Sequence, residues 1–179
     1  MNCTYDEIQT PKEVWESILE KCLIQSDEIF YEPFKGTGSL FNQVNVPVKY
    51  WSEITEGKNV FDFDYQTNND ITTIYTNPPF KCLIPNKKGI MKIKNCCYFF
   101  LEYFIKHFVS LKKIGFIMNV ACFQSLTPKR LQQLDALGFT ISKIIVFNVQ
   151  KWFGRYYFVL FERKTEQTNK LIDYLPNYF

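Results

Sequence analysis

Short apolar segments alternate with amphipathic segments along most of this 179-residue chain. Apolar runs of strand length cover residues 28–32, 48–53, 71–75, 114–120, 141–149 and 156–162. Helix-forming patterns cover residues 10–23, 96–111 and 127–137, and a further short helix is expected from about residue 40. Strands that alternate with helices favour a mostly parallel sheet covered by helices on both faces, so the sequence predicts an α/β fold. The last two strands are close in sequence, which predicts a C-terminal antiparallel hairpin at the sheet edge.

Two of the expected helices carry terminal signals. Thr10 is expected to cap the first helix, with Pro11 in its first turn and Glu13 three residues after the cap. Thr127 is expected to begin the last helix and Gly138 to end it. Residues between these elements are expected to form loops, including a polar loop over residues 54–69 with room for a one-turn helix.

The first expected strand ends in an acidic residue and a glycine turn, which read E-P-F-K-G-T-G-S from Glu32 to Ser39. Glycine lets the backbone approach a ligand closely. In a doubly wound sheet, ligands bind at the carboxyl ends of the strands. An acid at this position disfavours a phosphate and suits a cationic amino group, and the chain also lacks the G-x-x-x-x-G-K-[ST] phosphate loop. The alternative is an ordinary strand–turn–helix connection.

A second acid, Glu53, follows the second expected strand. A carboxylate about 20 residues after a glycine turn of this kind can accept hydrogen bonds from both hydroxyls of a ribose. An ordinary exposed glutamate is the alternative interpretation.

The third expected strand ends at Asn77-Pro78-Pro79-Phe80. Two consecutive prolines fix the backbone and remove two N–H donors. The amide oxygen of Asn77 and the carbonyl of Pro78 can then face one place, where they offer two acceptors to an –NH₂ group. Phe80 adds a flat stacking face beside them. A simple strand-ending turn is the alternative.

Charge is distributed unevenly along the chain. Residues 1–70 carry 5 Lys and Arg against 13 Asp and Glu, whereas residues 71–179 carry 16 against 5. Residues 81–94 are expected to form a lysine-rich loop in which Lys81, Lys87 and Lys88 meet the phosphates of a nucleic acid. The basic half therefore predicts a polyanionic partner, with a solvated basic surface as the alternative.

Composition limits the remaining possibilities. Hydrophobic residues make up 46% of the chain and charged residues 22%, which is typical of a globular domain. No apolar run approaches the roughly 20 residues needed to span a bilayer, and the polar, acidic N-terminus is no secretory signal. The chain is therefore expected in the cytoplasm, or in the host cell interior if viral, without a membrane partner. Six cysteines without a C-x-x-C pair and a single histidine give no reason to expect a metal site.

The order of these features resembles a known enzyme family. A Thr-Pro helix start, E-P-F-x-G-x-G-S, an acid after the second strand and N-P-P-F follow one another as in S-adenosylmethionine-dependent amino-methyltransferases. The resemblance is greatest to small phage-type DNA adenine-N6 methyltransferases, which lack a separate target-recognition domain. It covers about residues 10–163 of a single domain, 1–179. It implies the Rossmann-like class I methyltransferase fold and methyl transfer to N6 of adenine, in DNA or in RNA.

The resemblance also implies roles for particular residues. The residues implied to bind S-adenosylmethionine are Thr10, Glu32, Pro33, Phe34, Gly36, Gly38, Glu53, Ile54, Asn59, Asp62 and Asn77. Those implied to be catalytic are Asn77, Pro78, Pro79 and Phe80. Phe80 is also implied to stack on one face of the target base, and either Trp152 or Phe153 to cover the other, unless both pack on the sheet edge.

Two positions depart from the pattern of that family. Asn59 stands where an aspartate usually contacts the adenine ring of the cofactor, and Asp62 is the alternative contact. Lys35 stands where a small residue is common. Its ammonium group is expected either to repel a sulfonium or to point to solvent.

Two other functions remain open. Enzymes that methylate the side-chain amide of glutamine in proteins use a similar N-P-P-Y motif, so the substrate can be a protein. A non-catalytic subunit of a methyltransferase complex is the third possibility. Without a recognition domain, sequence specificity is expected to come from short loops or from a second subunit.

Overall fold

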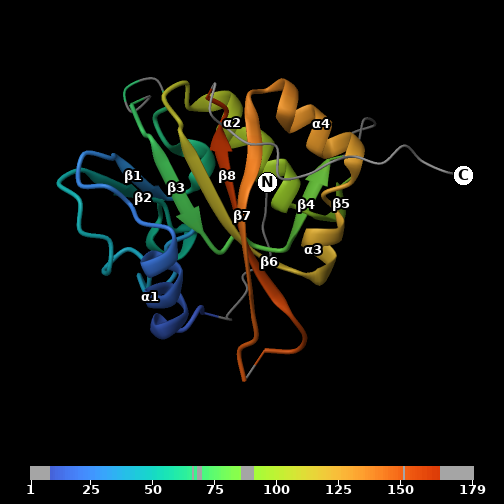
Figure 1. Cartoon of the computed structure of the whole chain (residues 1–179), viewed down its shortest axis with the longest axis horizontal. Coiled ribbons are helices and arrows are strands. Elements are labelled where there is room, and N and C mark those ends of the chain that lie inside the picture. The colour runs from blue at the N-terminus through green and yellow to red at the C-terminus, as the bar shows by residue number, and fades with distance from the viewer. Residues whose placement is uncertain (1–8, 66, 68–69, 86–90, 151, 166–179) are drawn as a thin grey trace, which may run out of the picture.

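The structure is a computed structural model that describes residues 9–65, 67, 70–85, 91–150 and 152–165, with backbone alone for 83–85 and 91–94. Its main sheet has six strands in the order β2-β1-β3-β6-β8-β7 (Figure 1). These strands are β1 (Phe30–Glu32), β2 (Lys49–Trp51), β3 (Thr73–Thr76), β6 (Lys113–Asn119), β7 (Phe139–Phe147) and β8 (Tyr156–Arg163). The first four strands in chain order are parallel, and β8 is antiparallel to both β6 and β7. The predicted α/β sheet with an antiparallel C-terminal hairpin is confirmed.

The strand order reverses beside β1. From β1 the chain passes to β2 on one side, then returns to β3 on the other side, where Phe30 pairs with Thr73 and Tyr31 with Ile74. A crevice at the carboxyl ends of the strands is expected at such a reversal. The glycine turn after β1 and the N-P-P-F motif after β3 both lie at this edge of the sheet.

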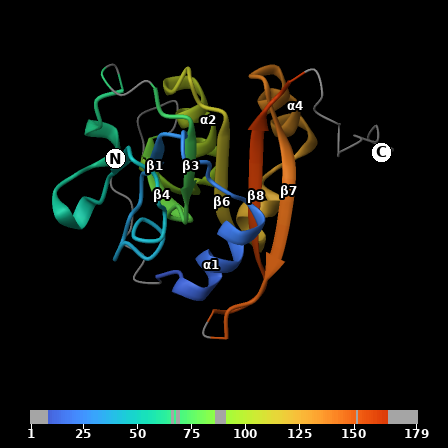
Figure 2. The same ribbon diagram turned by 60° about the vertical axis from the view of Figure 1, so that its left-hand side comes forward.

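Helices cover both faces of the sheet. They are α1 (Lys12–Lys21), α2 (Cys97–His107), α3 (Val120–Gln124) and α4 (Pro128–Ala136), with two short 3₁₀ helices, η1 (Ile54–Glu56) and η2 (Val60–Asp62). On one face, Trp15 and Ile18 of α1 pack with Phe30 of β1. On the other face, Phe100 and Phe104 of α2 pack with strand residues, and α4 adds Leu134 to the same cluster (Figure 2). Along β1, Phe30 and Tyr31 therefore serve opposite cores, as strand alternation requires.

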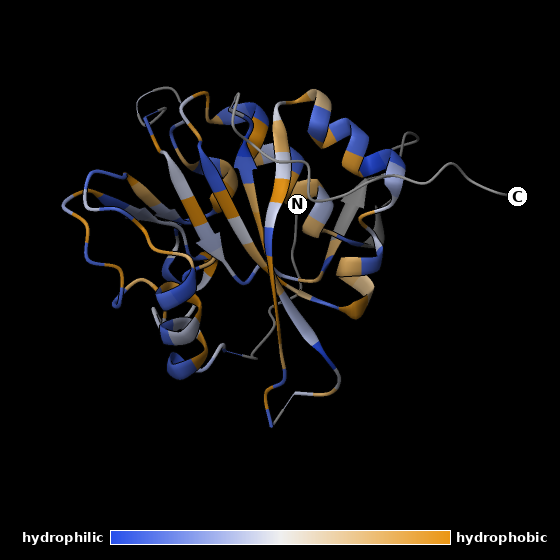
Figure 3. Ribbon diagram, in the orientation of Figure 1, coloured by the Kyte–Doolittle hydropathy of each residue, from blue (hydrophilic) through white to orange (hydrophobic). Residues whose placement is uncertain are grey.

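Hydropathy follows these layers. Strands β6 and β8 carry many hydrophobic residues, whereas α1 and α4 carry both hydrophobic and hydrophilic residues (Figure 3). In the described part of the chain, no helix is long and apolar enough to cross a bilayer. Across the same residues, His, Cys, Asp and Glu do not gather in threes that can hold a metal ion.

The expected start of the first helix is wrong in detail. Pro11 occupies the N-cap position, and no side chain of the described residues caps the helix. The Thr10 hydroxyl instead accepts a hydrogen bond from Asn77. A threonine hydroxyl can either cap a helix or bind a side chain that is distant in sequence, and here it binds the distant Asn77. The expected start of the last helix is confirmed, because the Thr127 side chain accepts from the backbone N–H of Arg130.

Three further expectations need correction. The short helix from residue 40 is absent; only isolated turns form, such as Asn42 N–H to Gly38 O, because the chain must soon reach β2. The expected loop over residues 81–94 contains an antiparallel pair, β4 (Lys81–Pro85) and β5 (Met91–Asn95). Residues 91–95 alternate apolar and polar side chains, a strand signal that the lysines obscured. The short helix α3 was not predicted; the Asn119 side chain caps it by accepting from the Cys122 N–H.

Candidate functional site

The glycine turn is held against β2 by its backbone. The Ser52 N–H donates to the Glu32 carbonyl and the Lys35 N–H to the Ser52 carbonyl, both at 3.0 Å, so the β1–β2 pairing continues past the strand ends. Gly36 has φ of 54°, a left-handed conformation that favours glycine. A Cβ added there would lie 2.2 Å from Oε1 of Gln9. Glycine therefore suits the conformation of residue 36, and a larger residue there would displace the Gln9 side chain.

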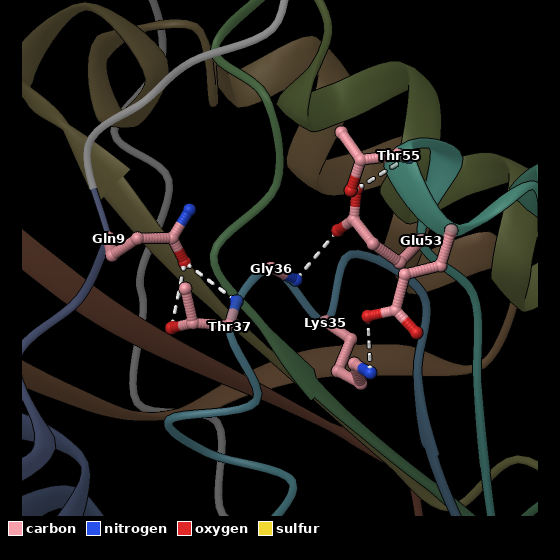
Figure 4. Close-up of polar contacts among 7 residues, drawn as sticks. Gln9, Lys35, Gly36, Thr37, Glu53 and Thr55 are labelled. Carbon is pink, nitrogen blue, oxygen red and sulfur yellow. Dashed lines mark hydrogen bonds and ion pairs between the residues drawn. The ribbon is translucent and has the colours of Figure 1, made fainter.

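Oxygens of the chain itself already occupy the amides of this turn. The Gly36 N–H donates to Oε2 of Glu53 at 2.7 Å, and the Thr37 N–H donates to Oε1 of Gln9 at 3.1 Å (Figure 4). A backbone cradle for a phosphate needs such amides to point freely at the ligand. The geometry thus supports the interpretation that this turn holds no phosphate.

Glu32 ends β1 as a buried acid, with only 2% of its surface exposed. Its Oε2 has no hydrogen-bond partner among the described residues. Burial raises the pKa of Glu32 well above its usual range, while a hydrogen bond from the Phe41 backbone and the charge of Lys35 act in the opposite direction. A buried acid with an unpaired oxygen suits a cationic group of a ligand, because such a group would both pair with it and favour its ionised form.

Glu53 is also buried, at 8% exposed. Its Oε1 accepts from the backbone N–H and the hydroxyl of Thr55, at 3.1 and 2.8 Å. Together with the Gly36 contact, three hydrogen bonds fix this carboxylate. A carboxylate has about four lone-pair sites, so about one remains for a ligand.

A cavity of about 480 Å³ opens beside β2. Trp51 and Ser52 line it from the strand, and Asn59 and Asp62 line it from the following loop. The Asn59 side chain caps η2 by accepting from the Phe61 N–H. Ile54 lies in sequence between the lining residues of β2 and those of the loop, and it is 53% exposed. The structure therefore brings the predicted residues Asn59 and Asp62 together around one hollow.

Asn77 follows β3 and contacts the segment before α1. Its Nδ2 donates to Oγ1 of Thr10 at 3.1 Å. Its Oδ1 is buried and makes no hydrogen bond within the described part of the chain. Pro78 is buried, and Pro79 and Phe80 are partly buried. One end of the Asn77 amide is thus anchored, while the other end is an acceptor that no described residue supplies with a donor.

The predicted substrate-binding residues do not all lie together. Phe80 and Trp152 both pack on Tyr156. Their ring centroids lie 6.3 Å (Phe80) and 4.5 Å (Trp152) from the Tyr156 ring centroid. Phe153 is 100% exposed in the connection between β7 and β8, which projects beyond the carboxyl end of β3 (Figure 1). Lys81 is exposed on β4. Two predicted lysines, Lys87 and Lys88, lie outside the described residues. The structure groups Trp152 with Phe80 and leaves Phe153 apart from them.

The cofactor residues still to be placed lie in the turn itself. Pro33 and Gly38 are buried, and Gly38 has φ of 83°. Phe34 stacks edge-on against Phe100 of α2, with centroids 4.7 Å apart. Sequence reasoning missed Gln9, which no local pattern marks apart from its place before Thr10.

No protein-family model matches this chain. No curated protein matches it in sequence either. Solved structures do match it in fold. A proposed class I S-adenosylmethionine-dependent methyltransferase from Listeria monocytogenes has a TM-score of 0.64 at 11% identity, over 91% of this chain and 62% of the other. The modification subunit of a proposed type I restriction enzyme from Vibrio vulnificus has a TM-score of 0.57 at 15% identity, over 87% and 44%.

A third structure is a proposed tRNA (m1A22) methyltransferase from Streptococcus pneumoniae, in complex with S-adenosyl-L-methionine. Its TM-score is 0.54 at 9% identity, over 89% of this chain and 76% of the other. This chain spans less than two thirds of the Listeria and Vibrio proteins. The likeness establishes the fold: a Rossmann-like sheet of the class I methyltransferase type, mostly parallel with antiparallel C-terminal strands.

Proposed function

We propose that this protein transfers the methyl group of S-adenosylmethionine to an exocyclic amino nitrogen, N6 of adenine in a nucleic acid, with DNA favoured over RNA. The observation that carries the proposal is the Asn77 amide. Its Nδ2 donates to Thr10, and its Oδ1, next to two prolines, is buried without a donor among the residues that the structure describes. An –NH₂ group is the natural partner for such an acceptor, because it carries donors and no charge.

The acids of the site fit the proposed cofactor. The Oε2 of the buried Glu32, which has no partner in the described part of the chain, suits the α-ammonium group of the methionine part. Glu53 is fixed by three hydrogen bonds and keeps an acceptor site for a ribose hydroxyl. The cavity lined by Asn59 and Asp62 offers room for the purine ring. When bound, S-adenosylmethionine supplies an electrophilic methyl group on a sulfonium.

The N-P-P-F motif would prepare the target amine for attack. The lone pair of an exocyclic amine is delocalised into its ring, so the nitrogen is a weak nucleophile. Hydrogen bonds to Oδ1 of Asn77 and to the Pro78 carbonyl would favour a more tetrahedral nitrogen with an available lone pair. Positioning and electrostatics then account for most of the rate. A strong general base is not needed if the proton leaves after the transfer.

Three features favour a nucleic acid as the substrate. Residues 71–179 carry 16 Lys and Arg against 5 Asp and Glu, which suits a polyanion. Phe80 offers a ring on which a base that is flipped out or single-stranded can stack. The structural neighbours include a restriction-modification subunit and a tRNA methyltransferase. Lys81, Lys87 and Lys88 would then meet the flanking phosphates, while Trp152 or Phe153 would cover the far face of the base.

Two alternatives make different predictions. A glutamine side-chain amide also presents an –NH₂ group, so a protein substrate would use the same acceptor. A subunit that depends on a partner for catalysis or specificity would show no transfer alone. The Vibrio vulnificus neighbour is itself described as a subunit, and this chain covers 44% of it.

Transfer of a radiolabelled methyl group tests the proposal. Purified protein is incubated with methyl-labelled S-adenosylmethionine and separate pools of DNA, RNA and glutamine-containing peptides. We expect label in DNA, less in RNA and none in peptides. Asn77→Ala should lower incorporation by about 10²–10³-fold, whereas Asn45→Ala, at an exposed asparagine outside the site, should not. Label in peptides alone would establish the protein alternative, and no label in any pool would overturn independent catalysis.

A further inference from the structure

Lys35 lies in the glycine turn, but its ammonium group reaches across to the loop after β2. Its Nζ lies 2.6 Å from Oε1 of Glu56, and its side chain is only 15% exposed. The same ammonium lies 3.9 Å from the ring centroid of Trp51. Figure 4 draws Lys35 and Glu53 on the two segments that this contact joins. The Lys35 side chain thus does not point freely to solvent; its charge is paired with that of Glu56.

The backbone joins the same two segments. The Gly36 N–H binds the Glu53 carboxylate, so the turn and the loop share the acid proposed to hold the ribose. The loop itself is closed by the Glu56 and Lys58 N–H groups, which both donate to the Glu53 carbonyl at 3.0 Å. Contacts of Lys35 with Trp51 and Glu56, here named the Lys35 latch, therefore add a side-chain link across a junction that contains Glu53.

Charge around the latch is closely spaced. Lys58 places a second ammonium 3.7 Å from the Trp51 ring centroid. The charge of Lys35 also favours the ionised form of Glu32, against the effect of burial on its pKa. The ammonium of Lys35 thus also favours the charged form of one buried acid of the site.

We propose that Lys35 is a positioning residue for the cofactor: by binding Glu56 and Trp51, it holds residues 53–58, and with them the Glu53 carboxylate, in the binding arrangement before the cofactor arrives. This inference rests on the proposed function for the identity of the ligand. A loop that is ordered beforehand does not have to be ordered on binding, which strengthens affinity without a new contact to the ligand.

Two measurements on the same proteins test this role. The affinity for S-adenosylhomocysteine is measured by calorimetry, and amide hydrogen exchange of Glu56, Gly57 and Lys58 is measured without ligand. Lys35→Met keeps the aliphatic stem and removes the charge. We expect this variant to bind about tenfold more weakly, because it loses one ion pair and one cation–π contact, and to exchange these amides faster. Lys35→Arg should restore both, because guanidinium can pair with a carboxylate and stack on an indole.

Lys106→Met is the matched control. Lys106 pairs with Glu102 at 2.7 Å on α2, and its side chain is 53% exposed. Its replacement should change neither readout. Wild-type affinity in Lys35→Met would overturn the inference and leave the proposed function standing. Failure of the wild-type protein to bind S-adenosylhomocysteine would instead overturn the proposed function, and this inference with it.

Discussion

The Nδ2 of Asn77 donates a hydrogen bond to Oγ1 of Thr10 at 3.1 Å, across 67 positions of sequence. With this contact at Nδ2, the other end of the amide is Oδ1. This oxygen is buried and has no donor in the described part of the chain. Leaving a buried acceptor unpaired costs about 1–3 kcal/mol, so such a group is expected where a ligand completes it.

Thr10 should therefore select an amine over a carbonyl at the target. In Thr10→Val the amide of Asn77 loses its anchor and can turn over, so that it presents –NH₂ instead of oxygen. Wild-type protein should bind oligodeoxyadenylate about tenfold more tightly than oligodeoxyinosinate, which carries a carbonyl at the same ring position. The preference should largely disappear in Thr10→Val and persist in Thr10→Ser. A preference that survives in the valine variant would show that Thr10 does not orient the amide.

The position of the N-P-P-F motif can be predicted from the sequence, but the hydrogen-bond partner of its asparagine cannot. The position of Asn77 at the end of β3 follows from local chemistry, since two prolines must end a strand. Its partner does not, because Thr10-Pro11-Lys12-Glu13 also fits the local pattern of a helix cap. Only the tertiary contact shows that the Thr10 hydroxyl binds Asn77 instead.

Other elements also divide into those that the sequence predicts and those that it does not. The strand ending in Glu32 and the following glycine turn were predictable from periodicity and turn residues. The pairing of β4 with β5 was not predicted. The lysines of this segment indicated a loop, and they obscured the alternation of apolar and polar residues that is typical of a strand. Gln9 was missed for a different reason: its bond to the Thr37 N–H depends on where α1 docks.

Gly36 and Gly57 offer a matched test of the turn. Both have positive φ, at 54° and 74°, but an added Cβ meets Oε1 of Gln9 only at Gly36 and nothing within 4 Å at Gly57. Each alanine variant should lose about 1 kcal/mol of unfolding free energy from backbone conformation. Gly36→Ala should lose about 1 kcal/mol more, because it displaces the Gln9 hydrogen bond. Urea unfolding measures both losses, and equal losses would argue against the close approach.

The buried Glu32 should make stability depend on pH in a defined direction. Its pKa is raised above the ordinary value of 4.5, mainly by burial. The unfolded chain therefore releases the proton first as the pH rises, and the folded state loses relative stability until the raised pKa is passed. Glu32→Gln lacks this loss. Without ligand, its unfolding free energy relative to wild type should therefore increase steadily from about pH 4.5 upward.

The control for this effect is a glutamate with an ion pair at the surface. Glu102 pairs with Lys106 on α2, so Glu102→Gln should not reproduce the increase. A difference between Glu32→Gln and wild type that stays constant with pH would mean that Glu32 ionises in the folded protein as it does in the unfolded chain.

The position of the methyl group on the target is the most direct test of the proposed function. Wild-type protein and Asn77→Ala are each given S-adenosylmethionine with a trideuterated methyl group and adenine-containing DNA, and the nucleosides are analysed by mass spectrometry. Trideuterated N6-methyladenine is expected from wild type. Removing one preorganised hydrogen-bond partner should lower its yield in Asn77→Ala by about 10²–10³-fold. Label on a ring nitrogen, or equal yields from the two proteins, would contradict a target amine held by Asn77.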